Sequence, residues 1–475
     1  MSANQSITKP IAFRLRPVER RLILIAVDLL VSYLALLISL YFWAQRDQWL
    51  HFSWEFLKQR PPLWFMFLPF LWILLINELY DPHRSSSPKE TIRGVLTGAA
   101  TGFGFYLVVF FLSDPDSLPR QGVATFLIFS AVLTFVWRLV YIKIFTAPSF
   151  IRHVLVVGAG KAGSSLCSAV NKIKPPPFMI AGLVDDDPEK FGRQIENCFP
   201  VLGRGAQLES LIYEHSITDL TVAISGEMKP EMFQALVNAQ EKGVSVRSMP
   251  SVYEELLGRV PIFLLQSDWI LRSFVDEAQA GGFYEGLKRL IDIVGGLIGT
   301  LFLVVLFPIV SIFTLIETGW PVIFTQKRLG MYGQEYNTLK FRTMVQSADH
   351  IKAQVTTTND ARITRVGRVL RKSHLDEWPQ FLNVLRGEMS MVGPRPEQSD
   401  LVAQLQANIP FYRARLLVKP GITGWAQVNF GYASTVEDTA VKLEYDLYYI
   451  KHRNLLLDLV ILLRTVGTVI GFRGT

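Results

Sequence analysis

The second half of this chain contains the segment KRLIDIVGGLIGTLFLVVLFPIVSIFTLIETG, residues 288–319. This segment decides on which side of a membrane the residues after it can fold. Its apolar run, residues 290–316, exceeds the roughly 20 residues that a helix needs to cross a bilayer. Pro308 interrupts the run, and a proline inside a helix removes a backbone donor and bends the axis. The segment therefore either spans the membrane or enters it, turns and leaves on the same side.

Flanking charges favour the second geometry. Lys288 and Arg289 precede the apolar run, and a cationic stretch follows Glu317. Positive residues gather on the cytoplasmic side of membrane proteins, so both ends of the segment are expected on that side. We predict a re-entrant helix at about 288–316, although the sequence alone does not exclude a spanning helix.

Four further apolar runs precede this segment, near residues 22–43, 63–80, 92–112 and 123–145. Each approaches the length of a membrane-spanning helix, so we predict a bundle of four transmembrane helices over residues 1–149. Cationic residues before the first run, between the second and third, and around the fourth mark the cytoplasmic side. Asp28 falls inside the first run, where a carboxylate is costly, and it is expected to snorkel toward the cytoplasmic headgroups.

Residues 150–275 have the pattern of an α/β domain. The stretch HVLVVGAGKAGSSLCSAV, residues 153–170, predicts a strand, a glycine turn and a helix. Gly158, Gly160 and Gly163 have the GxGxxG spacing, and Asp185 ends the next predicted strand, where a ribose-binding acid would fall. We predict a cytoplasmic Rossmann-like domain that is a structural or regulatory module, because this segment has no Tyr-x-x-x-Lys pair for proton transfer. The alternative is a domain that binds NAD or another nucleotide.

Composition points to a membrane protein with an anionic partner. Hydrophobic residues make up 50% of the 475 residues, and charged residues only 19%. The net charge is +7, and most of the excess lies after residue 280. Such a surface suits a lipid headgroup, a phosphorylated substrate or nucleic acid. Cys167 and Cys198 form no metal-binding pattern.

The most reactive stretch is SHLDEWPQFLNVLRGEMSMVGPRP, residues 373–396, which contains the adjacent carboxylates Asp376 and Glu377. Carboxylates act as metal ligands, general bases or nucleophiles, and hard oxygen ligands suit Mg²⁺. Neighbours on a helix point about 100° apart, so the two groups can take different tasks. An Asp-Glu pair by itself is usually a solvated surface feature, and that alternative remains open on the dipeptide alone.

The cations around this pair favour phosphate chemistry. Arginine side chains offer forked donors for phosphate oxygens, and Pro394 and Pro396 restrict the backbone on either side of Arg395. Nucleic-acid binding fits poorly with two acids among the cations and an apolar segment nearby. The neighbouring cations are Lys340, Arg342, Arg368, Arg371, Lys372, Arg386 and Arg395.

The order of these motifs resembles the bacterial sugar transferase family, the polyprenyl-phosphate glycosyl-1-phosphate transferases. Over residues 281–475 the resemblance rests on many sequence motifs. Over residues 1–280 it rests only on the predicted order of membrane helices and Rossmann-like domain. The usual Leu-Asp-Glu-Leu-Pro reads Leu-Asp-Glu-Trp-Pro here, an exchange of one apolar residue. The matching motifs are Lys288-Arg289-x-x-Asp292, Gln326-x-Arg328-x-Gly330-x-x-Gly333, Lys340-Phe341-Arg342-Thr343-Met344, Leu375-Asp376-Glu377-x-Pro379-Gln380, Met391-Val392-Gly393-Pro394-Arg395-Pro396-Glu397 and Lys419-Pro420-Gly421-Ile422-Thr423-Gly424.

The resemblance implies a two-step phosphoryl transfer. Asp376 would attack the β-phosphorus of a UDP-sugar and release UMP, and the phosphate of undecaprenyl phosphate would then take the sugar phosphate from Asp376. Glu377 would hold Mg²⁺, with Asp376 as a further ligand, or activate the lipid phosphate. Lys340, Arg342, Arg371, Arg386 and Arg395 would bind the substrate's phosphates; Lys288, Arg289 and Asp292 would anchor the re-entrant helix at the headgroups, with Pro308 at its bend.

The expected fold is a membrane α-helical bundle, a cytoplasmic α/β Rossmann-like domain and a small α+β catalytic domain on a re-entrant membrane helix, over residues 1–149, 150–275 and 281–475. The resemblance implies a bacterial inner-membrane enzyme that faces the cytoplasm and begins a polysaccharide repeat unit. UDP-glucose is the first expected donor and UDP-galactose the second, and a homo-oligomer is possible. Two alternatives are a membrane-tethered NAD-dependent sugar-nucleotide enzyme and a non-catalytic assembly scaffold.

Overall fold

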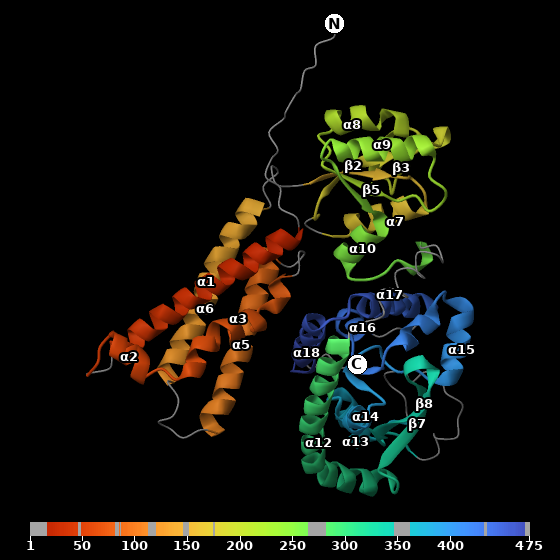
Figure 1. The fold of residues 1–475 in the computed structure, drawn as a ribbon. Coiled ribbons are helices and arrows are strands. Elements are labelled where there is room, and N and C mark those ends of the chain that lie inside the picture. Colours follow the sequence, from red (N-terminus) through yellow and green to blue (C-terminus); the bar gives the residue numbers. More distant parts are fainter. Residues whose placement is uncertain are drawn as a thin grey trace. The chain divides into compact units, whose positions relative to one another are not determined.

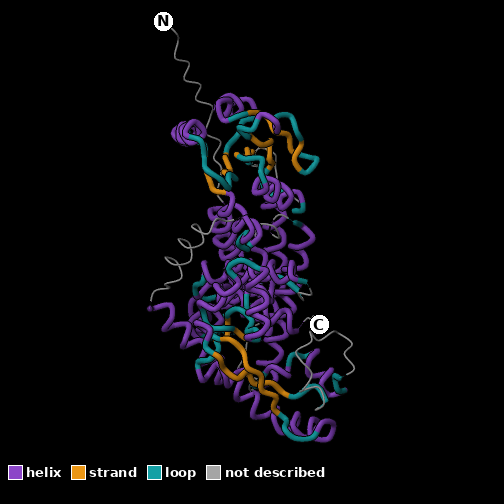
Figure 2. The backbone as a smooth tube through the Cα atoms, turned by 90° about the vertical axis from the view of Figure 1, so that its right-hand side faces the viewer, coloured by secondary structure: helices purple, strands orange, loops and turns teal. Residues whose placement is uncertain are grey.

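The chain divides into two compact units, Met1–Val246 and Arg247–Thr475, both drawn in Figure 1. The computed structural model describes residues 17–45, 49–80, 85, 87–112, 120–145, 152–173, 176–264, 282–345, 362–431 and 435–470. In Figure 2 the strands form two separate groups, one belonging to each unit. Arg14, Arg16, His83 and Arg84, which support the predicted orientation in the membrane, lie outside the described residues.

The first unit begins with a helical bundle. Its long helices are α1 (Pro17–Ala44), α5 (Pro88–Leu112) and α6 (Arg120–Phe145). Within α1 and α6, Glu19–Ala44 and Gln121–Ile144 are long and apolar enough to cross a membrane. The bundle core is apolar and aromatic, with Trp72, Phe65 and Phe126 almost completely buried. The predicted membrane helical part is therefore confirmed in its general character.

The second predicted span does not form one continuous helix. It divides into η1 (Leu63–Phe67), α3 (Leu68–Leu75) and η2 (Asn77–Tyr80), preceded by α2 (Trp54–Gln59). Pro69 stands in the first turn of α3, where its missing N–H ends the preceding 3₁₀ helix. The apolar helical stretch Leu63–Leu75 is consequently shorter than a regular span.

Asp28 points into the bundle and pairs there, so the prediction that its side chain snorkels outward is wrong. Its side chain is fully buried, and an Oδ2 oxygen accepts a hydrogen bond from Arg138 Nη2 at 2.6 Å. Arg138 also donates to the carbonyl oxygen of Leu79 and lies over the Tyr80 ring. A buried charge needs such a partner, so this pair joins α1 to α6 inside the bundle.

A six-stranded sheet forms the rest of the first unit, in the order β3-β4-β2-β1-β5-β6. Strand β1 is parallel to β2 and β5, β2 is parallel to β4, and β3 is antiparallel to β4. The predicted α/β domain is confirmed. Its elements are β1 (His153–Val157), α7 (Lys161–Asn171), β2 (Met179–Val184), η4 (Pro188–Lys190), β3 (Gln194–Ile195), β4 (Phe199–Gly203), η5 (Gly205–Gln207), α8 (Leu208–Glu214), β5 (Asp219–Val222), α9 (Pro230–Glu241) and β6 (Ser245–Ser248).

The second unit is mixed, with an antiparallel pair β7–β8 and a parallel pair β9–β10. Val260 and Ile262, which the sequence analysis assigned to the middle domain, belong to the second unit's core with Leu447 and Ile450. Its elements are α10 (Met249–Leu257), η6 (Ile262–Leu264), α12 (Gly282–Thr318), β7 (Ile323–Leu329), η7 (Met331–Gly333), β8 (Glu335–Phe341), α13 (Arg365–Lys372), η9 (Leu375–Glu377), α14 (Gln380–Arg386), β9 (Ser390–Val392), α15 (Ser399–Asn408), η10 (Tyr412–Leu417), β10 (Gly421–Thr423), α16 (Trp425–Asn429), α17 (Val436–His452) and α18 (Leu455–Ile470).

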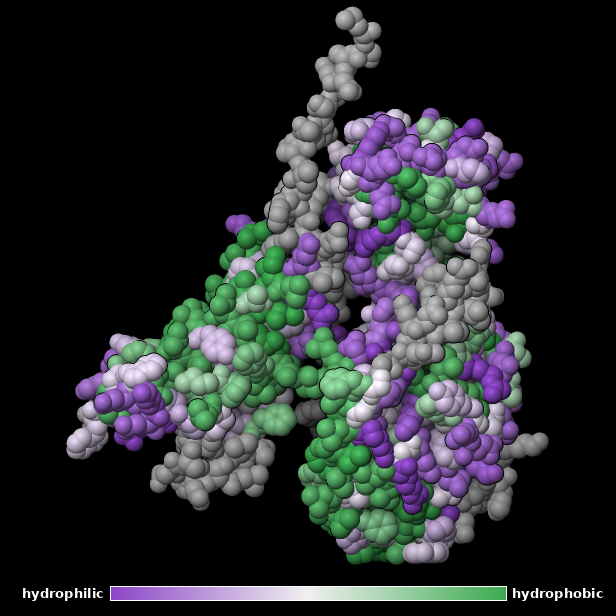
Figure 3. Space-filling model, in the orientation of Figure 1, coloured by the Kyte–Doolittle hydropathy of each residue, from purple (hydrophilic) through white to green (hydrophobic). Residues whose placement is uncertain are grey.

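Helix α12 is the longest element, with 37 residues and Pro308 inside it. Figure 1 shows that its axis changes direction along its length, as an internal proline is expected to cause. The helix exposes large apolar residues, among them Leu301 and Ile316. Figure 3 shows a green, hydrophobic surface over this part of the second unit. The helix also places Gly295, Gly296 and Gly299 against Met391, Leu385 and Phe381. The helix thus presents one face to protein and one suited to lipid.

Replacing Gly299 with alanine is expected to destabilise the second unit. A Cβ atom at this position would lie 2.3 Å from ring atoms of Phe381, and such overpacking typically costs about 1–3 kcal/mol. The matched control is Gly286→Ala in the same helix, where nothing lies within 4 Å. Thermal unfolding of the full-length protein in detergent should give a lower Tm for Gly299→Ala and an unchanged or higher Tm for Gly286→Ala. Equal melting temperatures would contradict this packing.

Glu444 makes stability depend on pH. Burial raises the pKa of this α17 carboxyl from 4.5 to about 7, and Arg259, 3.4 Å away, opposes the shift only in part. The folded state therefore holds the proton more tightly than the unfolded state. The resulting stability is complete below pH 4.5 and is lost as the pH rises through about 7.

Glu444→Gln should remove this dependence, because glutamine does not ionise. The Tm of the variant minus that of the wild type is expected to rise between pH 5 and pH 8. Glu437→Gln, an exposed substitution in the first turn of the same helix, is the control and should show no such trend. A pH-independent difference for Glu444→Gln would refute the assignment.

Candidate active site

Glu377 is the centre of the site because two cations from separate elements bind it. Lys340 Nζ, from β8, donates to Glu377 Oε1 at 2.6 Å. Arg395, which follows β9, donates from Nη2 to Oε1 at 2.6 Å and from Nη1 to Oε2 at 3.2 Å. The forked contact orients the Arg395 guanidinium as well as pairing its charge. Three of the predicted site residues are therefore brought together.

Asp376 lies beside this ion-paired group on η9, the short 3₁₀ turn between α13 and α14. Only 9% of the residue is exposed, and among the described residues it has no hydrogen-bond or ion-pair partner. His374, which precedes the turn, has a left-handed backbone with a φ of 56°, so the chain changes direction just before the two acids. The two adjacent carboxylates thus have different surroundings, as their spacing predicted.

The electrostatic environment separates the two acids further. Burial raises the pKa of Asp376, and so does the neighbouring Glu377 charge, whereas Lys340, Arg371 and Arg395 lower it in part. Burial alone would also raise the pKa of Glu377, but Arg395 and Lys340 hold it well below its usual range. Glu377 is therefore a fixed anion, and Asp376 is a carboxylate without a dedicated partner.

The remaining predicted phosphate ligands occupy different positions. Arg371, in the last turn of α13, donates from Nε to Thr343 Oγ1 at 2.9 Å and also acts on the Asp376 charge. Arg342 follows β8 and is buried, with 7% of the residue exposed. Arg386 is exposed at the end of α14, and no ion pair joins it to either carboxylate among the described residues. The structure does not bring Arg386 to the centre.

The three charged residues at the start of α12 bind protein groups. Lys288 donates to Tyr449 and to Asp458, each at 3.0 Å. Arg289 donates to the carbonyl oxygens of Val384 and Leu385 at the end of α14, at 2.8 Å each. These contacts hold α12 against the rest of the second unit. They do not support the predicted role of Lys288 and Arg289 in binding lipid headgroups.

Asp292 continues this pattern and is almost fully buried. Its Oδ1 accepts hydrogen bonds from Ser390 Oγ and the Met391 amide, both at 2.8 Å. At the other end of α12, Glu317 accepts hydrogen bonds from the amides of Arg365 and Val366, which begin α13. Helix α12 therefore holds the segments on both sides of Asp376. Sequence reasoning missed Glu317 because a carboxylate that caps a distant helix leaves no local pattern.

Asn383 is a second residue that sequence reasoning missed. It is completely buried in α14, its Oδ1 accepts the Leu339 amide at 3.1 Å, and its Nδ2 donates to the Asn337 carbonyl oxygen at 2.8 Å. These bonds fix strand β8 against α14 and so set the position of Lys340 relative to Glu377. The sequence could have indicated this role, because Asn383 is the one polar residue in the apolar stretch FLNVL, and a buried polar residue needs hydrogen-bond partners.

The glycine loop of the first unit has the predicted geometry, but its backbone donates a hydrogen bond to Asp185 of the same domain. Gly158 has a φ of +112°, and a Cβ atom at Gly163 would lie 2.1 Å from the Gly158 carbonyl oxygen. Gly160 precedes α7 with open space around it. Asp185 accepts a hydrogen bond from the Ala159 amide at 2.7 Å and pairs with Lys190 at 3.1 Å. The acid expected to bind ribose thus stabilises the loop itself.

Magnesium fits the site only with help from a substrate. Among the described residues, no cluster of three or more His, Cys, Asp or Glu side chains has the arrangement of a metal site. Mg²⁺ commonly takes one or two carboxylates together with substrate phosphate oxygens. The Asp376 carboxylate, to which no described residue donates a hydrogen bond, suits that arrangement, whereas both Glu377 oxygens already accept hydrogen bonds from cations.

Comparison with known proteins gives two family matches, to the bacterial sugar transferase family over residues 283–472 and to a CoA-binding domain family over residues 75–250. A UDP-N-acetylgalactosamine-undecaprenyl-phosphate N-acetylgalactosaminephosphotransferase from Aeromonas hydrophila is 36% identical over 56% of this chain and 61% of that protein. A UDP-glucose:undecaprenyl-phosphate glucose-1-phosphate transferase from Escherichia coli K12 is 43% identical over 55% and 51%. The chain thus matches about half to three fifths of the length of these two relatives.

A UDP-galactose-lipid carrier transferase from Erwinia amylovora is similar over a longer stretch. It is 31% identical over 340 residues, which are 68% of this chain and 69% of that protein. The motifs that carry the resemblance, including the acids and cations described above, lie inside the matched segment at residues 283–472. The chain belongs to the bacterial sugar transferase family.

Proposed function

We propose that this protein transfers a sugar-1-phosphate from a UDP-sugar to undecaprenyl phosphate and releases UMP. The observation that carries the proposal is the buried Asp376 carboxylate, which has no hydrogen-bond or ion-pair partner among the described residues, next to the ion-paired Glu377. A nucleophilic carboxylate needs an oxygen that is free to approach the phosphorus, whereas both Glu377 oxygens already accept hydrogen bonds from Lys340 or Arg395. The relatives named above act on nucleotide sugars and undecaprenyl phosphate or a lipid carrier.

In the proposed first step, an Asp376 oxygen forms a bond to the β-phosphorus of the donor. The bond from that phosphorus to the bridging oxygen breaks, UMP leaves, and the sugar phosphate remains on Asp376. In the second step, an oxygen of the lipid phosphate attacks the same phosphorus and Asp376 leaves. A covalent intermediate divides one difficult transfer into two easier ones.

The surrounding cations favour both steps electrostatically. Lys340 and Arg395 lie close enough to Asp376 to act on its charge, and Arg371 does so from α13. Together with Arg342 they would bind phosphate oxygens and stabilise the charge that develops during transfer. Glu377 orients Lys340 and Arg395 in the absence of substrate. Magnesium held by Asp376 together with donor phosphate oxygens would add charge neutralisation.

Helix α12 supports a membrane-surface location for this chemistry. Its exposed apolar side would lie in lipid, and its bend around Pro308 would return the chain to the side from which it entered. We propose that α12 is re-entrant and that the catalytic domain faces the cytoplasm of the inner membrane. Undecaprenyl phosphate would then meet Asp376 at the headgroup level. Glucose is the proposed sugar, because transferases named for UDP-glucose are among the relatives.

Release of UMP from a panel of UDP-sugars tests the proposed function. With undecaprenyl phosphate and Mg²⁺ present, UDP-glucose should give the fastest release, and chelation of Mg²⁺ should suppress it. Preference for UDP-galactose or UDP-N-acetylgalactosamine would correct the donor and keep the reaction. No release from any UDP-sugar would reject the reaction.

Exchange of labelled UMP into the UDP-sugar tests the covalent step. Without lipid, the wild type should catalyse this exchange, because the first step is complete before lipid binds. Asp376→Asn should abolish exchange, since a neutral amide does not form the intermediate. Asp400→Asn, an exposed change in the first turn of α15, is the matched control and should retain it. Exchange by Asp376→Asn would remove Asp376 from the nucleophile role.

Cysteine labelling from outside intact cells tests the topology. Glu241→Cys lies before α12 and Asp400→Cys after it, both at exposed positions, in a background where the exposed Cys198 is serine. With a re-entrant α12, neither cysteine should react until the membrane is permeabilised. Labelling of Asp400→Cys alone in intact cells would show that α12 spans the membrane.

A further inference from the structure

In the corner formed by Pro394–Arg395–Pro396–Glu397, all four backbone carbonyl oxygens accept hydrogen bonds. The Pro394 carbonyl oxygen accepts the Gly421 amide at 2.9 Å, and the Glu397 carbonyl oxygen accepts the Leu329 amide at 3.1 Å. The two carbonyls between them accept side-chain donors. Arg415 Nη2 donates to the Arg395 oxygen at 2.9 Å, and Arg328 Nη1 donates to the Pro396 oxygen at 2.8 Å.

Arg415 is buried and held in place by other groups. The same Nη2 donates to Asp446 Oδ2 at 2.8 Å, and Nη1 donates to Tyr412 Oη at 2.7 Å. Both Arg415 and Asp446 are at most 5% exposed. Glu397 lies 3.7 Å from Arg415 and 3.5 Å from Arg328, so it lies between the two guanidinium groups. A buried guanidinium with these partners has little freedom to reorient.

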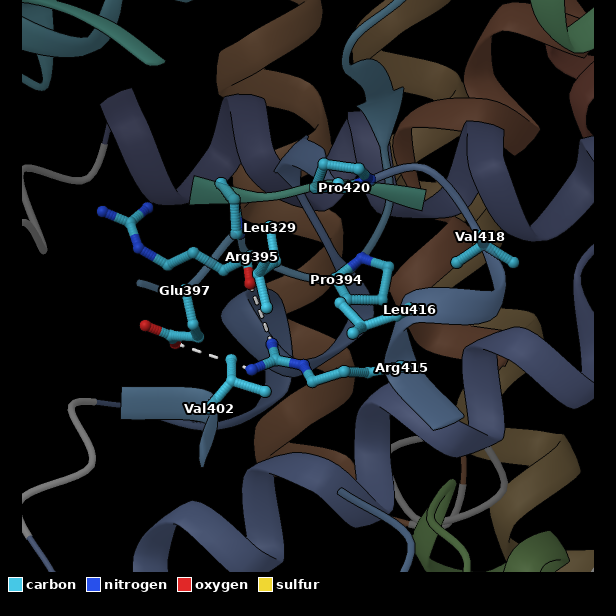
Figure 4. Close-up of a pocket in the computed structure, with 11 residues that line it drawn as sticks. Leu329, Pro394, Arg395, Glu397, Val402, Arg415, Leu416, Val418 and Pro420 are labelled. Atoms are coloured by element: carbon cyan, nitrogen blue, oxygen red, sulfur yellow. Dashed lines mark hydrogen bonds and ion pairs between the residues drawn. The ribbon is translucent and has the colours of Figure 1, made fainter. Parts of the chain in front are cut away.

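Figure 4 shows the consequence for Arg395. Its carbonyl oxygen faces Arg415, while its side chain extends away from the small pocket lined by Pro394, Leu416 and Val418. The two flanking prolines fix φ on either side and have no amide to bind elsewhere. The backbone from which the Arg395 side chain extends is therefore held by hydrogen bonds, and the guanidinium binds Glu377 at the other end of the side chain.

We propose that Arg415, oriented by Asp446, is a positioning residue for phosphoryl transfer, and that Arg328 is a second one. Neither is assigned contact with the substrate. Each holds one carbonyl of the proline corner, and through it the guanidinium of Arg395 at the Glu377 carboxylate. This inference rests on the proposed function, because its effect is read in the rate of UMP release.

A combination of substitutions tests the inference. Arg415→Lys keeps the positive charge near Asp446. It removes the guanidinium, which donates hydrogen bonds to Tyr412, Asp446 and the Arg395 carbonyl oxygen at the same time. Its kcat for UMP release should fall on the order of 10²-fold, with little change in KM for the UDP-sugar, because small misplacement of a catalytic group has effects of that size. Asp446→Asn should show the same division between kcat and KM.

The decisive measurement repeats Arg415→Lys in an Arg395→Ala background with radiolabelled donor. If Arg415 acts through Arg395, the second substitution should change the remaining rate less than about threefold, since coupled residues are not additive. An undiminished loss in that background would overturn the inference. Arg413→Lys, two residues away in η10 and exposed, is the matched control and should leave the rate unchanged.

Two further variants distinguish a loss of folding from a loss of catalysis. Arg328→Lys removes the other guanidinium fork and should reproduce the kcat effect and its disappearance in the Arg395→Ala background, even if Arg415→Lys does not fold. Asp376→Asn reports on the proposed function: if it matches the wild type, that function fails. A different result would reject only the positioning inference. In that case Asp376→Asn is inactive, but Arg328→Lys and Arg415→Lys lower the rate of UMP release in the Arg395→Ala background as much as they do in the wild type.

Discussion

The Glu377 carboxylate, whose side chain is only 14% exposed, is the constraint on which the second unit depends. A charge removed from water must be paired, and its two cations come from β8 and from the corner after β9. Both elements, together with η9, must therefore reach their final positions before the ion pairs can form. Glu377 binds Lys340 and Arg395, whereas Asp376 has no hydrogen-bond or ion-pair partner in the part of the chain that the structure describes. This is the arrangement that the proposed nucleophile requires.

Helix α12 supplies the frame for this arrangement. Arg289 caps the end of α14, Asp292 holds the start of β9, and Glu317 caps the start of α13. The same helix exposes leucine, isoleucine and phenylalanine on its other side. One element therefore meets the apolar surroundings and positions the reactive groups. This coupling explains why charged residues at the start of an apolar helix bind protein here, although their position beside a membrane segment suggested headgroups.

Local pattern was a good guide where the physics is local. The GxGxxG spacing required a strand, a turn with positive φ at Gly158 and a helix, and the structure has all three. Charge patterns over short distances also led to Lys340, Asp376, Glu377 and Arg395. Predictions failed where the outcome depends on a distant partner: Asp28 pairs with Arg138, 110 residues later, and no property of its own helix reveals that contact. Arg386 resembled its neighbours in charge, but its position on α14 directs it to solvent.

The sequence by itself determined which residue types could carry phosphate chemistry and that a long apolar segment adjoins them, because charge, hydropathy and proline content are properties of the chain. The tertiary structure alone decided how the two adjacent acids differ, since β8, α13 and the proline corner must meet in space to form their environments. It also revealed Asn383, Glu317, Arg328 and Arg415, whose roles are hydrogen bonds to distant backbone atoms. Such bonds depend on where the chain returns in space, and no spacing along the sequence encodes that.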